Sequence, residues 1–195
     1  MGERSLSSLK KAALLGAALL FSAADAPPAQ APEPRQDPKF GPNDVATVFY
    51  VAKSDGEGRV DYGIRLDEKC KPVGGESVVP YWREYRDFKP LGGTHPCSWF
   101  DKLGYGVASE KVTRSDPEGA ELSVRLKPVP REITITTSRG NDGKCQAVAK
   151  TTISGTKAEL ESAYLKLKRA MSVEYAELRG KNPQTREAVT EKLTE

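Results

Sequence analysis

The sequence has few of the residues that metal ions and nucleophilic catalysts most often use. Its 195 residues include one histidine, His95, and three cysteines, Cys70, Cys97 and Cys145. A closed zinc site usually takes four ligands of this kind, so it would need all of them, and no CxxC pair is present to begin one. A mechanism that requires two histidines is excluded. We therefore expect no metal site and no cofactor.

Motifs that mark a catalytic class are also missing. The sequence has no Walker A loop and no GxGxxG, GxSxG or HExxH motif. Cys97 or Ser98 could act as a nucleophile only with His95 as the base, and that imidazole need not reach either side chain. The roles of a catalytic site cannot be filled, so the sequence assigns no catalytic residue and favours a non-enzymatic function.

Neither sign of charge is in large excess, and a long hydrophobic run is missing. The chain has 30 lysines and arginines against 27 aspartates and glutamates, a net charge of +3. Nucleic-acid binding needs a basic stripe, so we expect no nucleic-acid partner. The apolar run at 12–21 has ten residues, whereas a membrane span needs about 20. We expect no transmembrane anchor in the mature chain.

The N-terminus does have the pattern of a secretory signal. Three basic residues precede the apolar run and small residues follow it, which is typical of a cleaved signal peptide over residues 1–24. Residues 25–44 contain six prolines, so we predict an extended linker there. A single β-rich domain is expected over 45–195, in a protein that is periplasmic or secreted.

From residue 45 onward, apolar residues alternate with polar ones, which is the pattern of half-buried strands. In residues 59–67, one face carries Val60, Tyr62, Ile64 and Leu66. Short turns separate such segments, and the turn RGNDGK would place Asn or Gly at positive φ. We predict a mainly β fold: an antiparallel β-sandwich or barrel of about nine or ten strands with one short helix.

Two segments do not alternate. Residues 97–103, CSWFDKL, are expected to form the short helix, packed on the domain through Trp99, Phe100 and Leu103. Residues 157–171 match a helix by periodicity, because one helical face would carry Leu160, Ala163, Tyr164, Leu167 and Met171. From the residues alone, that segment is a strand or a helix.

Four stretches carry a resemblance to a known family: VFYVAKS at 48–54, Pro-Tyr-Trp at 80–82, LGYGV at 103–107 and VEYAELRGKNPQTREAVTEK at 173–192. They resemble the domain of unknown function 4833 family over residues 45–195. The resemblance implies a small exported bacterial protein without an assigned function, so it transfers no functional residue. It also implies a strand at 158–168. Arg186 stands where the family usually has glycine, which costs stability if the position needs positive φ.

An exported protein reaches an oxidising compartment, in which disulfides form. Three cysteines allow three single pairings, and each pairing leaves one thiol. Cys70 and Cys97 lie in predicted loops that bracket one strand, so we predict a Cys70–Cys97 disulfide. Pairing of either with Cys145, or three free thiols, are the alternatives.

Half of the chain's 14 aromatic residues lie between positions 81 and 105. Aromatic rings with nearby cations can hold sugars, peptides or envelope polymers. We therefore predict a ligand-binding surface formed by Tyr81, Trp82, Arg83, Tyr85, Trp99 and Tyr105, with an envelope protein, glycan or lipid as the partner. The alternative is that these rings form the hydrophobic core.

Two other functions remain as alternatives. A small hydrolase could act on envelope glycan or peptide through carboxylates near Glu84 and Asp101, because two carboxylates about 5–10 Å apart can cleave glycosides. A purely structural domain could instead pair its edge strands with a partner. The enzyme requires polar side chains that converge in a pocket, the binding domain requires exposed aromatic rings, and strand pairing requires a long unprotected edge.

Overall fold

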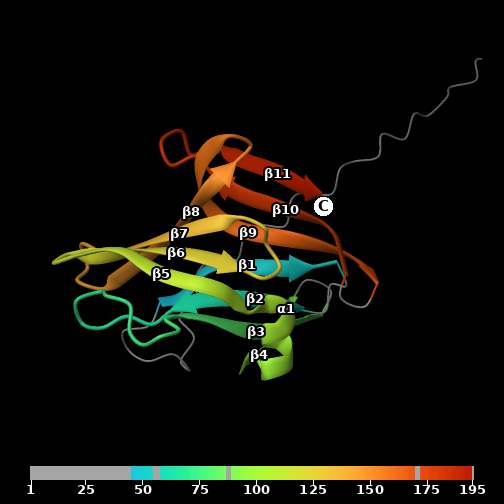
Figure 1. Ribbon diagram of the computed structural model, residues 1–195, viewed down its shortest axis with the longest axis horizontal. Helices are drawn as coiled ribbons and strands as arrows, with labels where there is room; N and C mark the ends of the chain where they lie inside the picture. The colour runs from blue at the N-terminus through green and yellow to red at the C-terminus, as the bar shows by residue number, and fades with distance from the viewer. Residues whose placement is uncertain (1–44, 55–57, 87–88, 170–171, 195) are drawn as a thin grey trace, which may run out of the picture. The chain divides into compact units, whose positions relative to one another are not determined.

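The computed structural model describes residues 45–54, 58–86, 89–169 and 172–194. The predicted signal peptide and linker lie outside the described residues. Within them the chain forms eleven strands and one helix (Figure 1), so the predicted mainly β fold with one short helix is confirmed. The elements are β1 (Val45–Lys53), β2 (Gly58–Ile64), β3 (Val78–Arg86), β4 (Lys89–Pro96), α1 (Trp99–Tyr105), β5 (Val107–Asp116), β6 (Gly119–Leu126), β7 (Glu132–Arg139), β8 (Cys145–Ile153), β9 (Thr156–Arg169), β10 (Ser172–Lys181) and β11 (Ala188–Thr194).

All eleven strands belong to one sheet, and β9 is its branch point. Residues 156–159 of β9 pair with β8, whereas residues 162–165 pair with β1. β10 pairs with β9 from residue 159 to residue 169. Two limbs, β1–β4 and β5–β8, therefore leave the same edge of β9 one after the other. The β1–β9 pair is parallel and the other pairs of named strands are antiparallel; the sequence did not predict this parallel pair.

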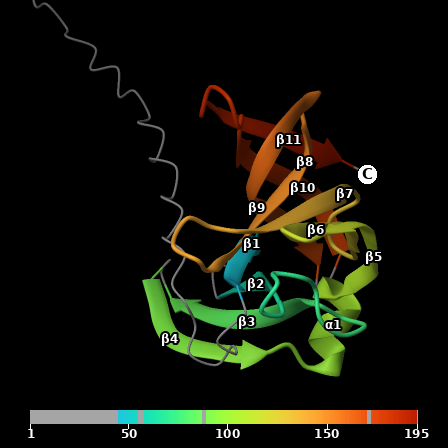
Figure 2. The same cartoon turned by 90° about the vertical axis from the view of Figure 1, so that its left-hand side faces the viewer.

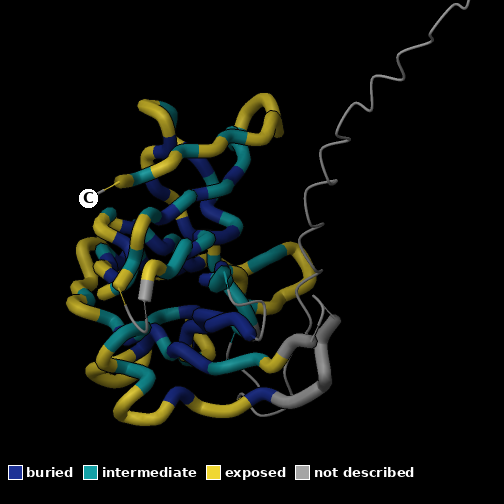
Figure 3. The backbone as a smooth tube through the Cα atoms, turned by 90° about the vertical axis from the view of Figure 1, so that its right-hand side faces the viewer, coloured by how far each residue is buried: buried dark blue, intermediate teal, exposed yellow. Residues whose placement is uncertain are grey.

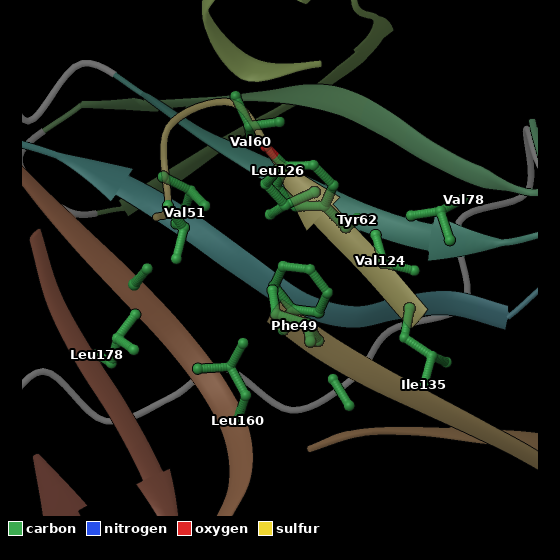
Figure 4. Close-up of a cluster of buried hydrophobic side chains, with 14 of the residues drawn as sticks. Phe49, Val51, Val60, Tyr62, Val78, Val124, Leu126, Ile135, Leu160 and Leu178 are labelled. Atoms are coloured by element: carbon green, nitrogen blue, oxygen red, sulfur yellow. The ribbon is translucent and has the colours of Figure 1, made fainter. Parts of the chain in front are cut away.

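The sheet curls on itself (Figures 1 and 2), and the apolar side chains of the two limbs form one core. Phe49 of β1 and Tyr62 of β2 stack with their ring centroids 4.9 Å apart. Leu122, Ile133 and Ile135 bury their side chains from the second limb. The buried residues line the inside of the curl and the exposed ones its loops and margins (Figures 3 and 4). Each large apolar side chain that is fully buried stabilises the fold by about 1.5–3 kcal/mol.

The predicted alternation of β2 is confirmed, because Val60, Tyr62, Ile64 and Leu66 are all buried in this core. The residues between them within β2 are buried as well, so that all seven residues of β2 are buried. Arg59 and Asp61, on the other face of β2, therefore need partners of their own.

Segment 157–171 is a strand through Arg169, as the family resemblance implies, and a bulge explains its helical pattern. Leu160 pairs with Gly180 and Ser162 with Arg179, so Glu161 is an extra residue in β9. The bulge resets the alternation. Leu160 and Ala163 consequently both face the core, although they are three residues apart, the spacing that imitates a helical face.

The β7–β8 and β10–β11 hairpins each have one turn residue at positive φ. In the β7–β8 turn that residue is Gly143, with φ of 77°, as predicted. In the β10–β11 turn it is Arg186, with φ of 62°. The Arg186 amide donates to the carbonyl of Asn182 at 2.9 Å, so the turn is tight and holds an arginine in a conformation that suits glycine.

The predicted Cys70–Cys97 disulfide is wrong: Cys70 is bonded to Cys145, 75 residues away. Cys70 lies in the β2–β3 connection and Cys145 begins β8, so the bond joins the two limbs. Thr137 of β7 fixes the same connection, because its hydroxyl donates to the carbonyl of Cys70 at 2.7 Å. Cys97 lies apart, as a buried free thiol between β4 and α1.

A carboxylate joins the limbs at a second place. Glu110 of β5 accepts hydrogen bonds from the amides of Ser77 and Val78, at 3.2 and 3.1 Å, and one from the Ser77 hydroxyl. Ser77 and Val78 lie at the start of β3, so the margin of the second limb is tied to the first.

Breaking the disulfide should destabilise the domain strongly. In the chain-entropy view, a cross-link over 75 residues contributes about 4 kcal/mol. We expect Cys145→Ser to lose stability of that order in urea unfolding. Cys97→Ala keeps the cross-link and should lose only about 1 kcal/mol. Equal losses in the two variants would contradict the assigned pairing.

The positive φ of Arg186 predicts that a glycine variant is more stable than an alanine variant. Both Arg186→Ala and Arg186→Gly remove the exposed ion pair with Glu159, which is 2.7 Å long, but only glycine relieves the positive φ. The glycine variant should therefore be about 1 kcal/mol more stable than the alanine variant in denaturant unfolding. A more stable alanine variant, the ordinary outcome within a strand, would show that the turn imposes no such strain.

Candidate functional site

The residues of the predicted binding surface are distributed over three environments. Tyr81 and Arg83 lie on the face of β3 that points away from the core, next to Asp61 of β2. Trp82 and Tyr105 pack against the core. Trp99 lies on α1, with its side chain in solvent. Tyr85 lies in β3, but its side chain is outside the described part of the chain.

Tyr81 and Arg83 belong to a buried ionic cluster. The Asp61 carboxylate is fully buried, with Arg59 Nε 2.6 Å from one oxygen and Arg83 Nε 2.8 Å from the other. Burial raises the pKa of Asp61, and the attraction of Arg59 and Arg83 only partly opposes this. The Tyr81 hydroxyl lies 2.5 Å from Thr47 Oγ1, and burial raises the pKa of Tyr81 to about 12. Arg59 Nη2 and Arg83 Nε both donate to Oδ2 of Asp61, whereas Oδ1 and Arg59 Nε are paired by charge and make no hydrogen bond of good geometry within the described part of the chain. The cluster has a structural role.

Trp82 and Tyr105 attach the C-terminal end of α1 to the core. Their ring centroids are 6.2 Å apart in an edge-to-face arrangement, and the Tyr105 carbonyl accepts a hydrogen bond of 2.7 Å from the Tyr62 hydroxyl. The indole of Trp82 also lies against Gly58, where a Cβ atom would come within 2.6 Å of the ring. A glycine is required at this close approach.

Unlike an ordinary surface helix, α1 exposes its large apolar side chains to solvent. Trp99, Phe100 and Leu103 are 76%, 54% and 55% exposed, and their helical spacing places them on one side. We call these three residues the α1 apolar surface. The Trp99 and Phe100 rings meet edge to face at 5.8 Å. The predicted packing of these residues on the domain is therefore wrong.

The opposite side of α1 makes the contacts to the rest of the domain. Ser98 and Asp101 cap the helix reciprocally, each side chain bonding the backbone N–H of the other. Lys102 Nζ lies 3.4 Å from Glu76, and Lys127 Nζ donates to the Lys102 carbonyl at 2.8 Å. Lys102, Lys127 and Tyr105 therefore attach α1 to the domain, while each side chain of the α1 apolar surface is more than half exposed.

Sequence reasoning found Trp99 but assigned Phe100 and Leu103 to packing. A short helix with apolar residues at positions i, i+1 and i+4 normally buries that face. The local signal that could have indicated otherwise is the capping box, together with Tyr105, which lies across the helix from Leu103 and faces the core.

The carboxylates of the alternative hydrolase each have a different partner. Glu84 lies 3.4 Å from His95, whereas Asp101 accepts from Ser98 in the cap. Burial raises the pKa of the Cys97 thiol to about 12, so that thiol is protonated at neutral pH. Across the described ranges, no group of three or more His, Cys, Asp or Glu side chains could hold a metal ion.

The edge strands are each interrupted or covered. β4 contains Pro90 and Pro96, which cannot donate to another strand. β5 has two irregularities in its pairing with β6, and bulges twist an edge away from a partner. In β11, the Thr190 carbonyl accepts a hydrogen bond of 2.8 Å from the Ser154 hydroxyl.

Comparison with known proteins gives one match. The family model described as "Domain of unknown function (DUF4833)" matches residues 49–192. No curated protein and no solved structure matches the chain significantly.

The ionic cluster predicts the cost of neutralising Asp61. Asp61→Asn leaves the guanidiniums of Arg59 and Arg83 beside each other without a carboxylate, and removing one member of a buried ion pair typically costs about 3–5 kcal/mol. We expect a loss of that order in urea unfolding. Glu177→Gln, which removes the more exposed ion pair with Arg179, should cost less than about 1 kcal/mol.

The difference in unfolding free energy between the native protein and Asp61→Asn should change with pH in one direction. Because the pKa of Asp61 is raised on folding, the native state binds this proton more tightly than the unfolded chain. The contribution of Asp61 to the stability of the fold is therefore fully present below its ordinary pKa of 3.8. It declines as pH rises through the pKa of the folded state. As pH rises through this range, the stability of the native protein should exceed that of Asp61→Asn by less and less. A stability difference that grows with pH would contradict the raised pKa.

Proposed function

Because the chain belongs to the family described as a domain of unknown function (DUF4833), which specifies no activity, we propose a function from the geometry. The protein is an exported envelope protein whose domain binds an envelope partner without catalysis, through the α1 apolar surface. The observation that carries the proposal is the reversed polarity of α1: its polar side holds the domain and its large apolar side chains face solvent.

The size of this surface supports a binding role. From the exposed fractions of Trp99, Phe100 and Leu103, the apolar area is on the order of 400 Å². The largest contiguous apolar patch on a typical monomeric protein is about 300–600 Å² and is often functional, so the α1 apolar surface has the size of such a patch. Elsewhere, the exposed large hydrophobic residues of the described chain are single valines: Val73, Val112 and Val148.

The surface is also held in a fixed conformation. The capping box secures the first turn of α1, and the contacts of Lys102 and Tyr105 secure the rest. A binding surface that is already ordered loses little conformational entropy when a partner binds. This rigidity favours a dedicated binding helix over a loop that happens to expose apolar residues.

The other functions have less support. Glu84 and Asp101 are engaged with different partners, and no observation favours a hydrolase. Pairing of edge strands needs an unprotected edge, whereas β4, β5 and β11 are each blunted or covered. Export is supported by the signal-like residues 1–24 and by the Cys70–Cys145 disulfide, which persists in oxidising compartments. A periplasmic or secreted location is part of the proposal.

A position-specific photo-cross-link tests the proposal. Phe100 is replaced by p-benzoylphenylalanine in the full chain, exported by a bacterial host, and Val148 is replaced in the same way as the control. Val148 is also exposed but lies on β8. We expect adducts with envelope material at position 100 at several times the yield at position 148. Equal yields, or no adduct at position 100, would contradict binding through α1.

A further inference from the structure

We propose that the partner of the α1 apolar surface is a lipid bilayer, into whose interfacial region Trp99, Phe100 and Leu103 insert. This inference rests on the function proposed above and names the partner. It would make the protein a reversible, peripheral membrane-binding protein, held by one short helix that lies at the surface of the lipid.

The α1 apolar surface alone is too small for a stable protein–protein interface. Such an interface buries about 800 Å² on each side, roughly twice the area that Trp99, Phe100 and Leu103 expose, so a protein partner would also have to contact the polar surroundings of α1. The same limit applies to a second copy of this chain packed α1 against α1. A bilayer imposes no such minimum, because each apolar side chain that enters it contributes independently.

The residue types fit the boundary between headgroups and acyl chains. Tryptophan is enriched at that boundary, because its ring is large and apolar and carries one polar N–H. Phenylalanine and leucine on the same side of a helix are typical of helices that lie in the interface plane. The other side of α1, where Lys102 and Tyr105 contact the domain, would stay outside the acyl chains.

The charges around α1 indicate that insertion is driven by apolar burial. Lys102 is 3.4 Å from Glu76, and Lys127 at the C-terminal end of the helix is balanced by Asp101 in its first turn. The formal charges of these four groups cancel. Binding should therefore depend little on headgroup charge or on salt, unlike binding through a polybasic patch.

Three side chains can give only moderate affinity. A single myristoyl chain binds membranes with an association constant of about 10⁴ M⁻¹, and the α1 apolar surface is not expected to exceed it. The protein would exchange between bilayer and water, and the exposed rings of Trp99 and Phe100 would remain compatible with a dissolved state.

Vesicle binding tests the inference directly. The exported chain is mixed with vesicles of phosphatidylcholine, or of phosphatidylcholine with an equal amount of phosphatidylglycerol, and sedimented. We expect both compositions to bind the protein within about threefold of each other. Lipids with brominated acyl chains should quench Trp99, and Trp99→Phe should lose that quenching while Trp82 stays in the protein.

The decisive variant replaces the three apolar residues by serine: Trp99→Ser, Phe100→Ser and Leu103→Ser. These side chains do not contribute to the core, so folding should be retained, which urea unfolding and the intact disulfide verify. We expect the partition coefficient to fall at least tenfold. The matched control, Val112→Ser with Val148→Ser, removes exposed apolar residues elsewhere and should change it by less than twofold.

Each outcome has a definite meaning. Failure of the native protein to bind either vesicle, unchanged binding by the triple variant, or binding confined to anionic vesicles and abolished by salt would overturn bilayer insertion. If vesicles do not bind but position 100 still cross-links to a protein or glycan, the bilayer is wrong and the binding function of α1 stands. If neither is observed, both proposals are wrong.

Discussion

The arrangement of this domain depends on one strand edge that serves two partners. The first residues of β9 pair with β8 and the next residues pair with β1, while β10 pairs with β9 over residues 159–169. Two limbs that begin side by side cannot continue as one flat sheet, so they diverge and fold over each other. Their apolar faces then form one core without a second layer of helices. The bulge at Glu161 lies where the pairing changes from β8 to β1, which lets both stretches of β9 face that core.

The closure of the two limbs also accounts for the helix. The chain must pass from β4 at the margin of the first limb to β5 at the margin of the second, and α1 is part of that connection (Figure 2). Strands have already supplied the core, so α1 needs only Tyr105 and a few polar contacts to hold its position. Its apolar side chains are left outside. The surface to which we assign binding is thus a by-product of a core that is complete without it.

Local patterns were sufficient for the strands but not for their partners. The alternation at β2 and the glycine turn of the β7–β8 hairpin each follow from a few neighbouring residues, and both are confirmed. The disulfide and the parallel β1–β9 pair join segments far apart in sequence, which no local periodicity encodes. The helical pattern in 157–171 misleads because a bulge places Leu160 and Ala163 on one face. The orientation of α1 could not be predicted either, because it depends on whether the core has room for Trp99 and Phe100, which other strands decide.

The third cysteine has a consequence for the durability of the cross-link between the limbs. Thiol–disulfide exchange needs a thiolate that can approach a sulfur atom. Cys97 is buried and its thiol pKa is raised to about 12, so the native chain offers no internal nucleophile at neutral pH. A protein with an odd number of cysteines is ordinarily exposed to shuffling among alternative pairings. In the folded state the competing thiol is buried. Cys97 can therefore exchange with the Cys70–Cys145 disulfide only after the domain has opened.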